Sequence, residues 1–345
     1  MVARSVFHVD LDQFIAAVEV LRRPELRGVP VVVGGDGDPT KRGVVSTGSY
    51  EARAFGIRSG MPLRTALKKC PDAVFLPVDA EHYLAASRDV MATLKTFPAI
   101  VEVAGWDEAF MEILSDDAEG LARAVQRAVR ERTHLWCSIG IGDNKLRAKI
   151  ASDMAKPQGV FRLTSENWHA VMDQLSPRSL WGIGPKSQKR LEALGIGSVA
   201  ELARADEGTM TNAFGPGIGV WIGRLARGED DSPVSDEPHR PRSRGRERTF
   251  QRDLTDHDQV RREIATLARE VAGDMANDDD RRLGRRVVVK VRFAPFVTHT
   301  HGASLGEPSM DPAAIEKTAL AALARFELDR PIRLLGVKVE LEPPA

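Results

Sequence analysis

Three acidic residues stand beside apolar segments, where a carboxylate needs a partner. Asp10 follows the apolar run 6–9, and Asp107 and Glu108 lie between two further apolar segments, VEVAG and AFMEI. Removing a carboxylate from water costs several kcal/mol unless it is paired, hydrogen-bonded or bound to a metal. Three oxygen donors with no histidine or thiolate expected nearby suit a hard cation such as Mg²⁺. The spacing therefore indicates a metal site built at strand ends.

Purely structural roles remain open for each of these acids taken alone. Asp10 and Asp12 could cap a helix that starts at Gln13, and the cap role fits Asp12 better than Asp10. Glu108 could face solvent.

Two further segments carry residues suited to binding an anion. In the segment TGSYEAR at 47–53, a predicted strand runs into a helix whose first turn offers hydroxyls, free N–H groups and an arginine. A helix start of this kind is an anion site. Lys156 ends another predicted helix, which a proline stops, and a lysine there is also a common partner of the helix dipole.

The elements that must position these residues alternate between strands and helices over residues 1–165, so a layered sheet is expected. The predicted strands cover residues 6–9, 30–33, 44–47, 74–77, 100–104, 109–113 and 137–142. The predicted helices cover residues 13–21, 50–55, 63–70, 81–97, 118–131 and 145–155.

The second half of the chain changes character twice. Residues 166–228 have only a helical pattern, interrupted by glycine pairs such as GIG at 182–184, and predict a small all-helical domain. The predicted order after residue 246 is strand, helix, two strands, helix and strand, with the helices at 260–275 and 312–326. This βαββαβ order predicts a second small α/β domain.

Composition excludes several classes of protein. The 345 residues are 42% hydrophobic and 28% charged, which is typical of a globular chain with two to three domains. No apolar run approaches the length of a membrane span, and the N-terminus lacks a signal-peptide pattern, so we expect a soluble, cytoplasmic protein. Cys70 and Cys137 lie in apolar segments, which predicts reduced core residues.

The net charge is zero, but the basic residues are unevenly distributed. Residues 240–252 (RPRSRGRERTFQR) hold six arginines and one acid, directly after the acidic, proline-broken stretch 229–238. This pattern indicates an exposed linker that enters a basic module.

With these motifs in order, the chain resembles the Y-family, lesion-bypass DNA polymerases of the DinB or polymerase IV branch. The resemblance spans the whole length. It rests on HVDLDQF at 8–14, TGSYEARAFGIRSGMP at 47–62, WDEAF at 106–110, NKLRAKIASDMAKPQG at 144–159, WGIGPKSQKRLEALGI at 181–196 and RERTF at 246–250. It implies an α+β multidomain right-hand polymerase with a palm (1–18 and 77–165), small fingers (19–76), a helical thumb (166–231), a linker (232–243) and a βαββαβ little finger (244–345).

The resemblance assigns roles to the residues of these motifs. Asp10, Asp107 and Glu108 match the metal-binding carboxylates, and the carbonyl of Leu11 matches an additional ligand, for two Mg²⁺ ions, with Mn²⁺ compatible with the same ligands. Within the nucleotide-binding segment 11–15, Phe14 matches the aromatic beneath the sugar. The full nucleotide-binding set is Leu11, Asp12, Gln13, Phe14, Ile15, Thr47, Tyr50, Arg53 and Lys156.

Two segments are candidates for DNA contacts. Gly182 and Gly184, followed by Lys186, Lys189 and Arg190, fit a helix-hairpin-helix whose backbone amides and basic side chains bind phosphates without reading sequence. A plain helix turn is the alternative. If residues 244–248 form a strand, Arg244, Arg246 and Arg248 share one face, ready for template phosphates, and a solvated edge strand is the alternative.

The chain departs from the family pattern at three places. Ile15 stands where the family has a bulky aromatic that clashes with a ribose 2′-hydroxyl, which predicts weak ribose discrimination and use of rNTPs as well as dNTPs. Gly105 and Trp106 replace the usual Ser-Ile before the paired acids. The C-terminal GVKVELEPPA lacks the glutamine-and-aromatic tail that commonly binds the sliding clamp, so clamp recruitment is not expected.

The expected function is template-directed DNA synthesis of the translesion type, with low processivity, by a monomer that binds primer-template DNA and no membrane. One alternative is a catalytically inactive polymerase-fold protein that binds DNA or serves as a scaffold. Another is a two-metal nuclease or phosphatase that uses the same acids without needing Tyr50, Arg53 and Lys156.

Overall fold

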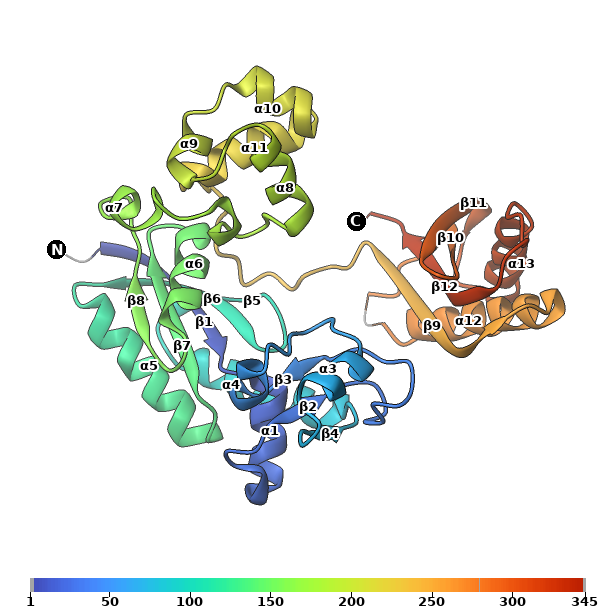
Figure 1. Ribbon diagram of the computed structural model, residues 1–345, viewed down its shortest axis with the longest axis horizontal. Helices are drawn as coiled ribbons and strands as arrows, with labels where there is room; N and C mark the ends of the chain where they lie inside the picture. Colours follow the sequence, from blue (N-terminus) through green and yellow to red (C-terminus); the bar gives the residue numbers. More distant parts are fainter. Residues whose placement is uncertain (1–2, 279, 344–345) are drawn as a thin grey trace. The chain divides into compact units, whose positions relative to one another are not determined.

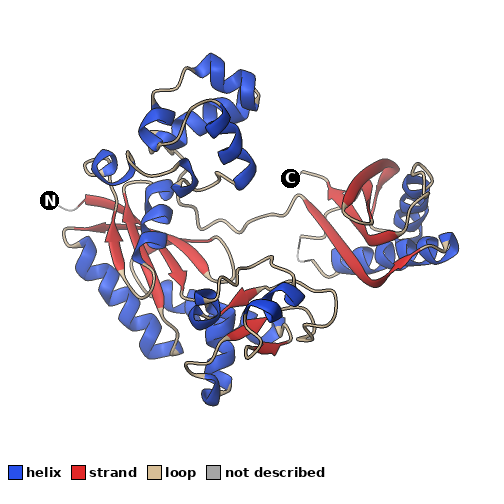
Figure 2. Cartoon of the chain, viewed as in Figure 1, coloured by secondary structure: helices blue, strands red, loops and turns tan. Residues whose placement is uncertain are grey.

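The computed structural model describes residues 3–278 and 280–343 (Figures 1 and 2). The chain divides into two compact units, one of residues 1–38 and 43–238 and the other of residues 39–42 and 239–345. No helix in the described ranges is long and apolar enough to cross a membrane.

A five-stranded sheet forms the centre of the first unit. Its strands lie in the order β5 (Ala99–Val103), β6 (Glu108–Ser115), β1 (Ala3–Leu11), β7 (Cys137–Gly142) and β8 (Val160–Arg162). All neighbours are antiparallel except β7 and β8. β1 therefore lies at the middle of the sheet, with Asp10 near its end.

Helices cover both faces of this sheet. Alternate residues of β1, including Phe7 and Val9, join the apolar face of α5 (Ala118–Thr133) and residues of α4 (Ala80–Leu94) in one buried core. The opposite face carries α6 (Lys145–Ala155), which approaches β7 closely because Gly140 lacks a side chain. A Cβ at Gly140 would lie 2.0 Å from the carbonyl oxygen of Ala148. The glycine thus lets α6 lie directly over the strands that carry the acids.

Residues 14–76 add a small three-stranded sheet with short helices. The strand order is β3 (Thr47–Gly48), β2 (Val31–Val33) and β4 (Val74–Leu76). The accompanying helices are α1 (Phe14–Arg22), the 3₁₀ turn η1 (Pro24–Leu26), α2 (Tyr50–Ala54) and α3 (Leu63–Lys69).

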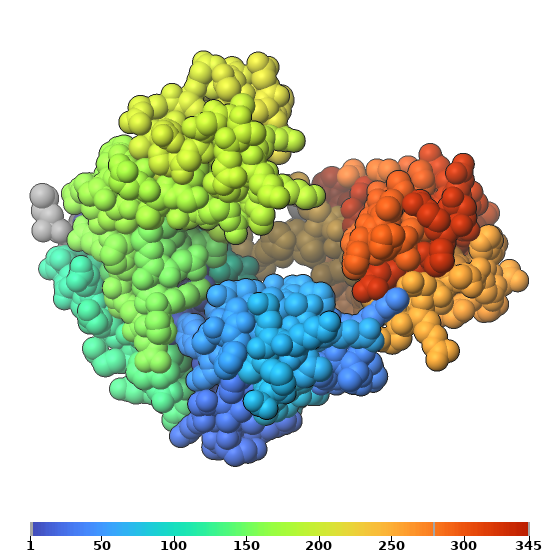
Figure 3. Space-filling view, in the orientation of Figure 1, coloured from blue at the N-terminus to red at the C-terminus, as the bar shows by residue number. Residues whose placement is uncertain are grey.

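Residues 168–226 form a helical lobe, yellow-green in Figure 3. Its elements are α7 (Trp168–Met172), η2 (Pro177–Ser179), α8 (Pro185–Ala193), α9 (Val199–Ala203), α10 (Glu207–Phe214) and α11 (Pro216–Ala226). Its core also includes Leu146 and Ile150 of α6, so the lobe packs on the helix that lies over the acids.

The second unit is a four-stranded antiparallel sheet with two helices packed on one face (Figure 1). Its elements are β9 (Ser243–Leu254), α12 (His257–Ala276), β10 (Gly284–Phe293), β11 (Val297–Ser309), α13 (Pro312–Leu323) and β12 (Ile332–Leu341), with sheet order β11-β10-β12-β9. The predicted βαββαβ order is confirmed. Buried and more exposed residues alternate along β10, and the buried ones, Val287, Val289 and Val291, pack under the helices. This alternation explains why both helices lie on one face of the sheet.

Two details of the predicted elements are wrong. The strand predicted at 44–47 is reduced to Thr47–Gly48, and Val44 makes only an isolated bridge to Pro62. β8 was absent from the predicted strands because Val160–Arg162 is too short to give an alternating pattern. Both cysteines are buried and free, as predicted.

Candidate active site

Strand pairing brings the three predicted carboxylate residues to one edge of the central sheet. In the β1–β6 register, Asp10 lies opposite Glu108, and the N–H of Leu11 donates to the carbonyl of Asp107 at 2.8 Å. Residues a hundred positions apart therefore become neighbours through backbone hydrogen bonds. Asp107 lies in the turn that enters β6, where the N–H groups of Ala104 and Gly105 both donate to the Glu108 carbonyl at 3.1 Å.

The same turn contains Gly105 and Trp106, one of the three departures from the family pattern. Gly105 fits a tight place, since a Cβ there would lie 3.2 Å from Cγ of Glu108, while Trp106 remains 43% exposed. A larger residue at position 105 would therefore crowd Glu108, whereas Trp106 is accommodated at the surface.

The three carboxyl groups have different electrostatic surroundings. Burial raises the pKa of Asp10 and of Asp107 above the ordinary range, and the neighbouring Glu108 charge raises the pKa of Asp107 further. In contrast, the hydrogen bond and the positive charge of Lys149 hold the pKa of Glu108 below its ordinary range. The site therefore holds concentrated negative charge that needs cations.

Two lysines supply that positive charge. Lys156 Nζ lies 2.9 Å from Asp10 Oδ2 and 3.0 Å from Asp153 Oδ1. Lys149 Nζ lies 2.5 Å from Glu108 Oε2. Lys156 ends α6, as the sequence indicated, but its ammonium reaches the strand end instead of serving only the helix dipole.

The sequence analysis missed His8. Its side chain is fully buried, and its Nε2 lies 3.4 Å from Glu108 Oε2. His8, Asp10 and Glu108 each offer a ligand atom within 4.8 Å of the other two, so the site is not limited to oxygen donors. The alternation of β1, which puts residues 8 and 10 on one face, was the signal that could have found it.

The ring orientation of His8 follows from its neighbours. Ser152 Oγ donates its one proton to the carbonyl of Lys149 at 2.8 Å, so it accepts from His8 Nδ1 at 2.7 Å. The Nε2 lone pair therefore faces Lys149 and Glu108. Burial lowers the pKa of His8, which favours this neutral form.

Asp12 does not cap α1, so the cap role that seemed to fit it is wrong. The residue before α1 is Gln13, with φ of 44°, and no side chain caps this helix start. Asp12 is 3% exposed and accepts three hydrogen bonds instead. The donors are Tyr50 Oη at 2.8 Å, Ser138 Oγ at 2.9 Å and the Gln158 N–H at 2.8 Å.

This arrangement connects two of the predicted phosphate-binding segments. Asp12 fixes Tyr50 on α2 and also the turn at Gln158, two residues after Lys156. The Tyr50 hydroxyl donates to a carboxylate, and burial together with this bond raises its pKa. Asp12 is thus a positioning residue at the centre of the group.

The start of α2 is less open to anions than predicted. Gln13 Oε1 accepts from the Tyr50 N–H, and Ser49 Oγ accepts from the Ala52 N–H, so two of the N–H groups already have acceptors. Arg53 lies over the Tyr50 ring at 5.2 Å and donates through Nε to the Gly48 carbonyl at 2.9 Å. Side chains must therefore do more of any phosphate binding here than backbone N–H groups.

The segment after Asp12 forms the first turn of α1, which begins at Phe14. Phe14 is buried in the core, and Ile15 is half-buried against the same core. Thr47 is half-buried in β3.

In the helical lobe, Gly182 has φ of 95° and a Cβ there would lie 2.5 Å from Trp221. Gly184 precedes α8, and Lys186 is exposed on its first turn. Arg190 donates to the Ala213 carbonyl at 2.7 Å. The glycine-rich turn and its exposed lysine fit the predicted helix-hairpin-helix geometry, while the Arg190 side chain already has an acceptor.

In the second unit, the three predicted arginines lie on one face of β9 but already have partners. Arg244 pairs with Asp278 and Arg246 with Asp274, both bidentately, and Arg248 reaches Glu263 and Glu270. The acids all project from α12 or the turn after it. The prediction of one shared face holds. Each of the three arginines has an acidic partner because that face of β9 lies against α12, and their binding to template phosphates stays a prediction.

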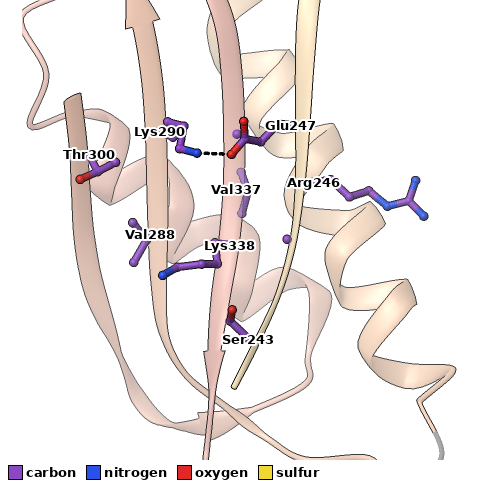
Figure 4. Close-up of a pocket in the computed structure, with 10 residues that line it drawn as sticks. Ser243, Arg246, Glu247, Val288, Lys290, Thr300, Val337 and Lys338 are labelled. Atoms are coloured by element: carbon purple, nitrogen blue, oxygen red, sulfur yellow. Dashed lines mark hydrogen bonds and ion pairs between the residues drawn. The ribbon is translucent and has the colours of Figure 1, made fainter. Parts of the chain in front are cut away.

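The other face of this sheet holds a groove of about 390 Å³ (Figure 4). Lys290 and Glu247 point toward one another across it as an ion pair, and Arg246 points away from them. The lining residues are Ser243, Gly245, Arg246, Glu247, Val288, Lys290, Thr300, Gly336, Val337 and Lys338.

Comparisons with known proteins agree with this geometry. The model of the impB/mucB/samB family matches residues 9–153, and that of the family's C-terminal domain matches residues 241–341. The chain is 48% identical over 342 residues to "DNA polymerase IV 2" of Mycobacterium tuberculosis (strain ATCC 25618 / H37Rv), covering 98% of both chains. It is 39% identical to "DNA polymerase IV" of Methanoculleus marisnigri, covering 98% of this chain and 94% of the relative.

Solved structures show the same architecture. A Y-family DNA polymerase chimera, Dbh-Dpo4(243-245)-Dbh, superposes with a TM-score of 0.83 at 26% identity, over 97% of this chain and 98% of the chimera. DinB from Sulfolobus solfataricus superposes with a TM-score of 0.65 at 26% identity, over 98% of both chains. The chain therefore belongs to the impB/mucB/samB family and is a DNA polymerase of the Y family, of the DinB type.

Proposed function

We propose that this polymerase carries out template-directed nucleotidyl transfer with two divalent cations held by Asp10, Asp107 and Glu108 and by the Leu11 carbonyl. The observation that supports the proposal is the β1–β6 pairing, in which Asp10 lies opposite Glu108 beside Lys156 and Lys149, with Asp107 in the adjoining turn. The donor set fits such ions, because it is anionic and rich in oxygen. When bound, the cations would stabilise the attacking primer oxygen and the leaving pyrophosphate.

The residues of the chain itself would hold the incoming nucleotide. Lys156 is already an ammonium aimed at the strand end, and exchange of Asp153 for a phosphate oxygen would need little movement of its flexible side chain. Tyr50, fixed by Asp12, and Arg53 would contribute further donors, with Thr47 at the adjacent strand. A triphosphate needs several such charge-assisted bonds.

The segments of the chain would serve as the domains of a right-hand polymerase. Residues 1–18 and 77–165 serve as the palm, 19–76 as the fingers, 166–231 as the thumb and 232–243 as the linker to the little finger, 244–345. The backbone of Gly182 and Gly184 and the side chain of Lys186 would bind primer-template phosphates, and Arg244, Arg246 and Arg248 would do so only by exchanging the acids of α12 for phosphates. The binding would be independent of sequence.

Ile15 would discriminate weakly between sugars. A rigid ring excludes the ribonucleotide by a clash with its 2′-hydroxyl, and isoleucine excludes less volume. Use of rNTPs beside dNTPs follows from this proposal.

Primer extension by a single nucleotide tests the function. With each of the four templating bases, the purified chain should add the complementary dNTP, release pyrophosphate and stop when the divalent cation is chelated. Shortened primers would indicate a nuclease, and DNA binding without extension would indicate the inactive scaffold. Either result would reject the proposal.

A further inference from the structure

Lys149 connects a catalytic carboxylate to the helical lobe. Its Nζ lies 2.5 Å from Glu108 Oε2 and 5.6 Å from the centre of the Trp181 ring, which stands in the segment leading to α8. The Lys149 side chain is 13% exposed, whereas Trp181 is 52% exposed. One ammonium thus has a catalytic acid as one partner and an accessible indole as another.

His8 provides a third partner for this ammonium. Because Ser152 fixes the Nδ1–H of His8, the Nε2 lone pair accepts from Lys149 Nζ at 3.3 Å. A carboxylate, an imidazole lone pair and an aromatic face all attract the same cation. Lys149 is therefore held in place by three groups at once.

The same Glu108 oxygen would face a divalent cation in the proposed function, on which this step rests. An ammonium at 2.5 Å from that oxygen and a divalent cation bound to it repel each other strongly. We infer that Lys149 is a positioning residue that competes with the divalent cation for Glu108, so that cation binding moves Lys149 and alters its contact with Trp181. Metal occupancy is thereby coupled to the helical lobe.

Lys145 is a matched control on the same helix. It lies one turn earlier in α6, its side chain is also 13% exposed, and it too combines an acid with an aromatic ring. Its Nζ lies 2.6 Å from Glu102 Oε2 and 5.3 Å from the centre of the Phe110 ring. Glu102 is not one of the three carboxylates, so loss of Lys145 removes an equivalent buried charge away from the site.

Binding of Mn²⁺ to the full chain without DNA tests the competition directly, with free Mn²⁺ measured by electron paramagnetic resonance. Removal of one charge at roughly 5 Å, screened as in water, corresponds to about a tenfold change in affinity. Lys149→Met should therefore bind Mn²⁺ about tenfold more tightly than wild type. Lys149→Arg, which keeps the charge, and Lys145→Met should bind like wild type.

The other outcomes separate this inference from the proposed function. Wild-type affinity in Lys149→Met, or tighter binding in Lys149→Arg as well, overturns the competition. If Asp107→Asn binds Mn²⁺ as wild type does, the metal site itself is wrong and the inference falls with it. Weaker binding in Asp107→Asn with no effect of Lys149→Met rejects only the role of Lys149.

A measurement that needs no change at Lys149 tests the coupling to Trp181. The difference in fluorescence between wild type and Trp181→Phe isolates this indole from the other four tryptophans. Added Mg²⁺ should change the Trp181 emission in wild type and leave it unchanged in Lys149→Met. Emission from Trp181 that does not respond to Mg²⁺ in wild type overturns the coupling.

Discussion

Replacement of Asp12 tests how the proposed triphosphate-binding residues are held. Asp12→Ala leaves the fully buried Ser138 hydroxyl and the Gln158 N–H without their acceptor, and it releases the Tyr50 hydroxyl. A buried donor left without a partner costs about 1–3 kcal/mol, so we expect the free energy of unfolding to fall by about 3 kcal/mol.

Asp12→Asn should be much milder. Its amide oxygen can accept from the Gln158 N–H, and its NH₂ group can donate to the Tyr50 and Ser138 hydroxyls, which rotate to accept. The loss should be about 1 kcal/mol, since the charge disappears but every group keeps a partner. The ranking of the two variants thus follows from the geometry of the three contacts.

Urea unfolding and dNTP kinetics measure both consequences. Because Asp12 holds Tyr50 and the turn after Lys156, Asp12→Ala should raise the KM for the incoming dNTP about tenfold, equivalent to about 1.4 kcal/mol of lost nucleotide binding. Tyr50→Phe, which removes only one of the three contacts, is the control and should lie between wild type and Asp12→Ala. Wild-type stability or KM in Asp12→Ala would refute the reasoning.

Three further predictions concern the acids, the sugar and the arginines. The pKa of Asp107 is raised on folding, so its ionisation destabilises the folded chain increasingly as the pH rises through that pKa. Asp107→Asn should therefore raise Tm at pH 7. This gain in Tm should vanish toward pH 3, where wild-type Asp107 is protonated. A gain independent of pH would contradict this cause. Ile15→Phe should lower kcat/KM for rNTPs about thirtyfold, or 2 kcal/mol, without a comparable loss for dNTPs; equal sugar selectivity in the two proteins would reject the role of Ile15. Arg246→Ala should lower the salt dependence of DNA binding by about one phosphate contact on every template. Asp274→Asn should strengthen DNA binding, because it frees Arg246 from its acidic partner. A loss of affinity on one template sequence only, or weaker DNA binding by Asp274→Asn, would argue against both predictions.

Features of the fold and of the site that depend on a local sequence pattern could be predicted. Asp10 could be placed at a strand end because the segment 6–9 is apolar apart from His8. The βαββαβ order could be predicted from the alternating segments of the second unit. Lys156 could be located at a helix end because Pro157 follows it.

The remaining contacts depend on which elements pack together, and local pattern is silent on this. His8 and Lys149 meet only because α6 lies over β1, which requires Gly140 on the neighbouring strand β7, directly opposite His8. The arginines of β9 acquire partners because α12 packs beside that strand. Asp12 was misassigned for the same reason, since all three of its partners, Tyr50, Ser138 and Gln158, lie far away in the sequence.

In the proposed function, Asp10, Asp107 and Glu108 perform the chemistry and contribute little to DNA binding. Rapid-quench addition of one dNTP to a bound primer-template, with DNA affinity measured on the same samples, tests it most directly. Asp107→Ala should lose at least a thousandfold in the rate of addition, or about 4 kcal/mol of transition-state stabilisation, while DNA affinity stays within about twofold. The control variant Asp116→Ala, which changes an exposed acid after the other end of β6, should keep the wild-type rate. Addition by Asp107→Ala at the wild-type rate would contradict the account.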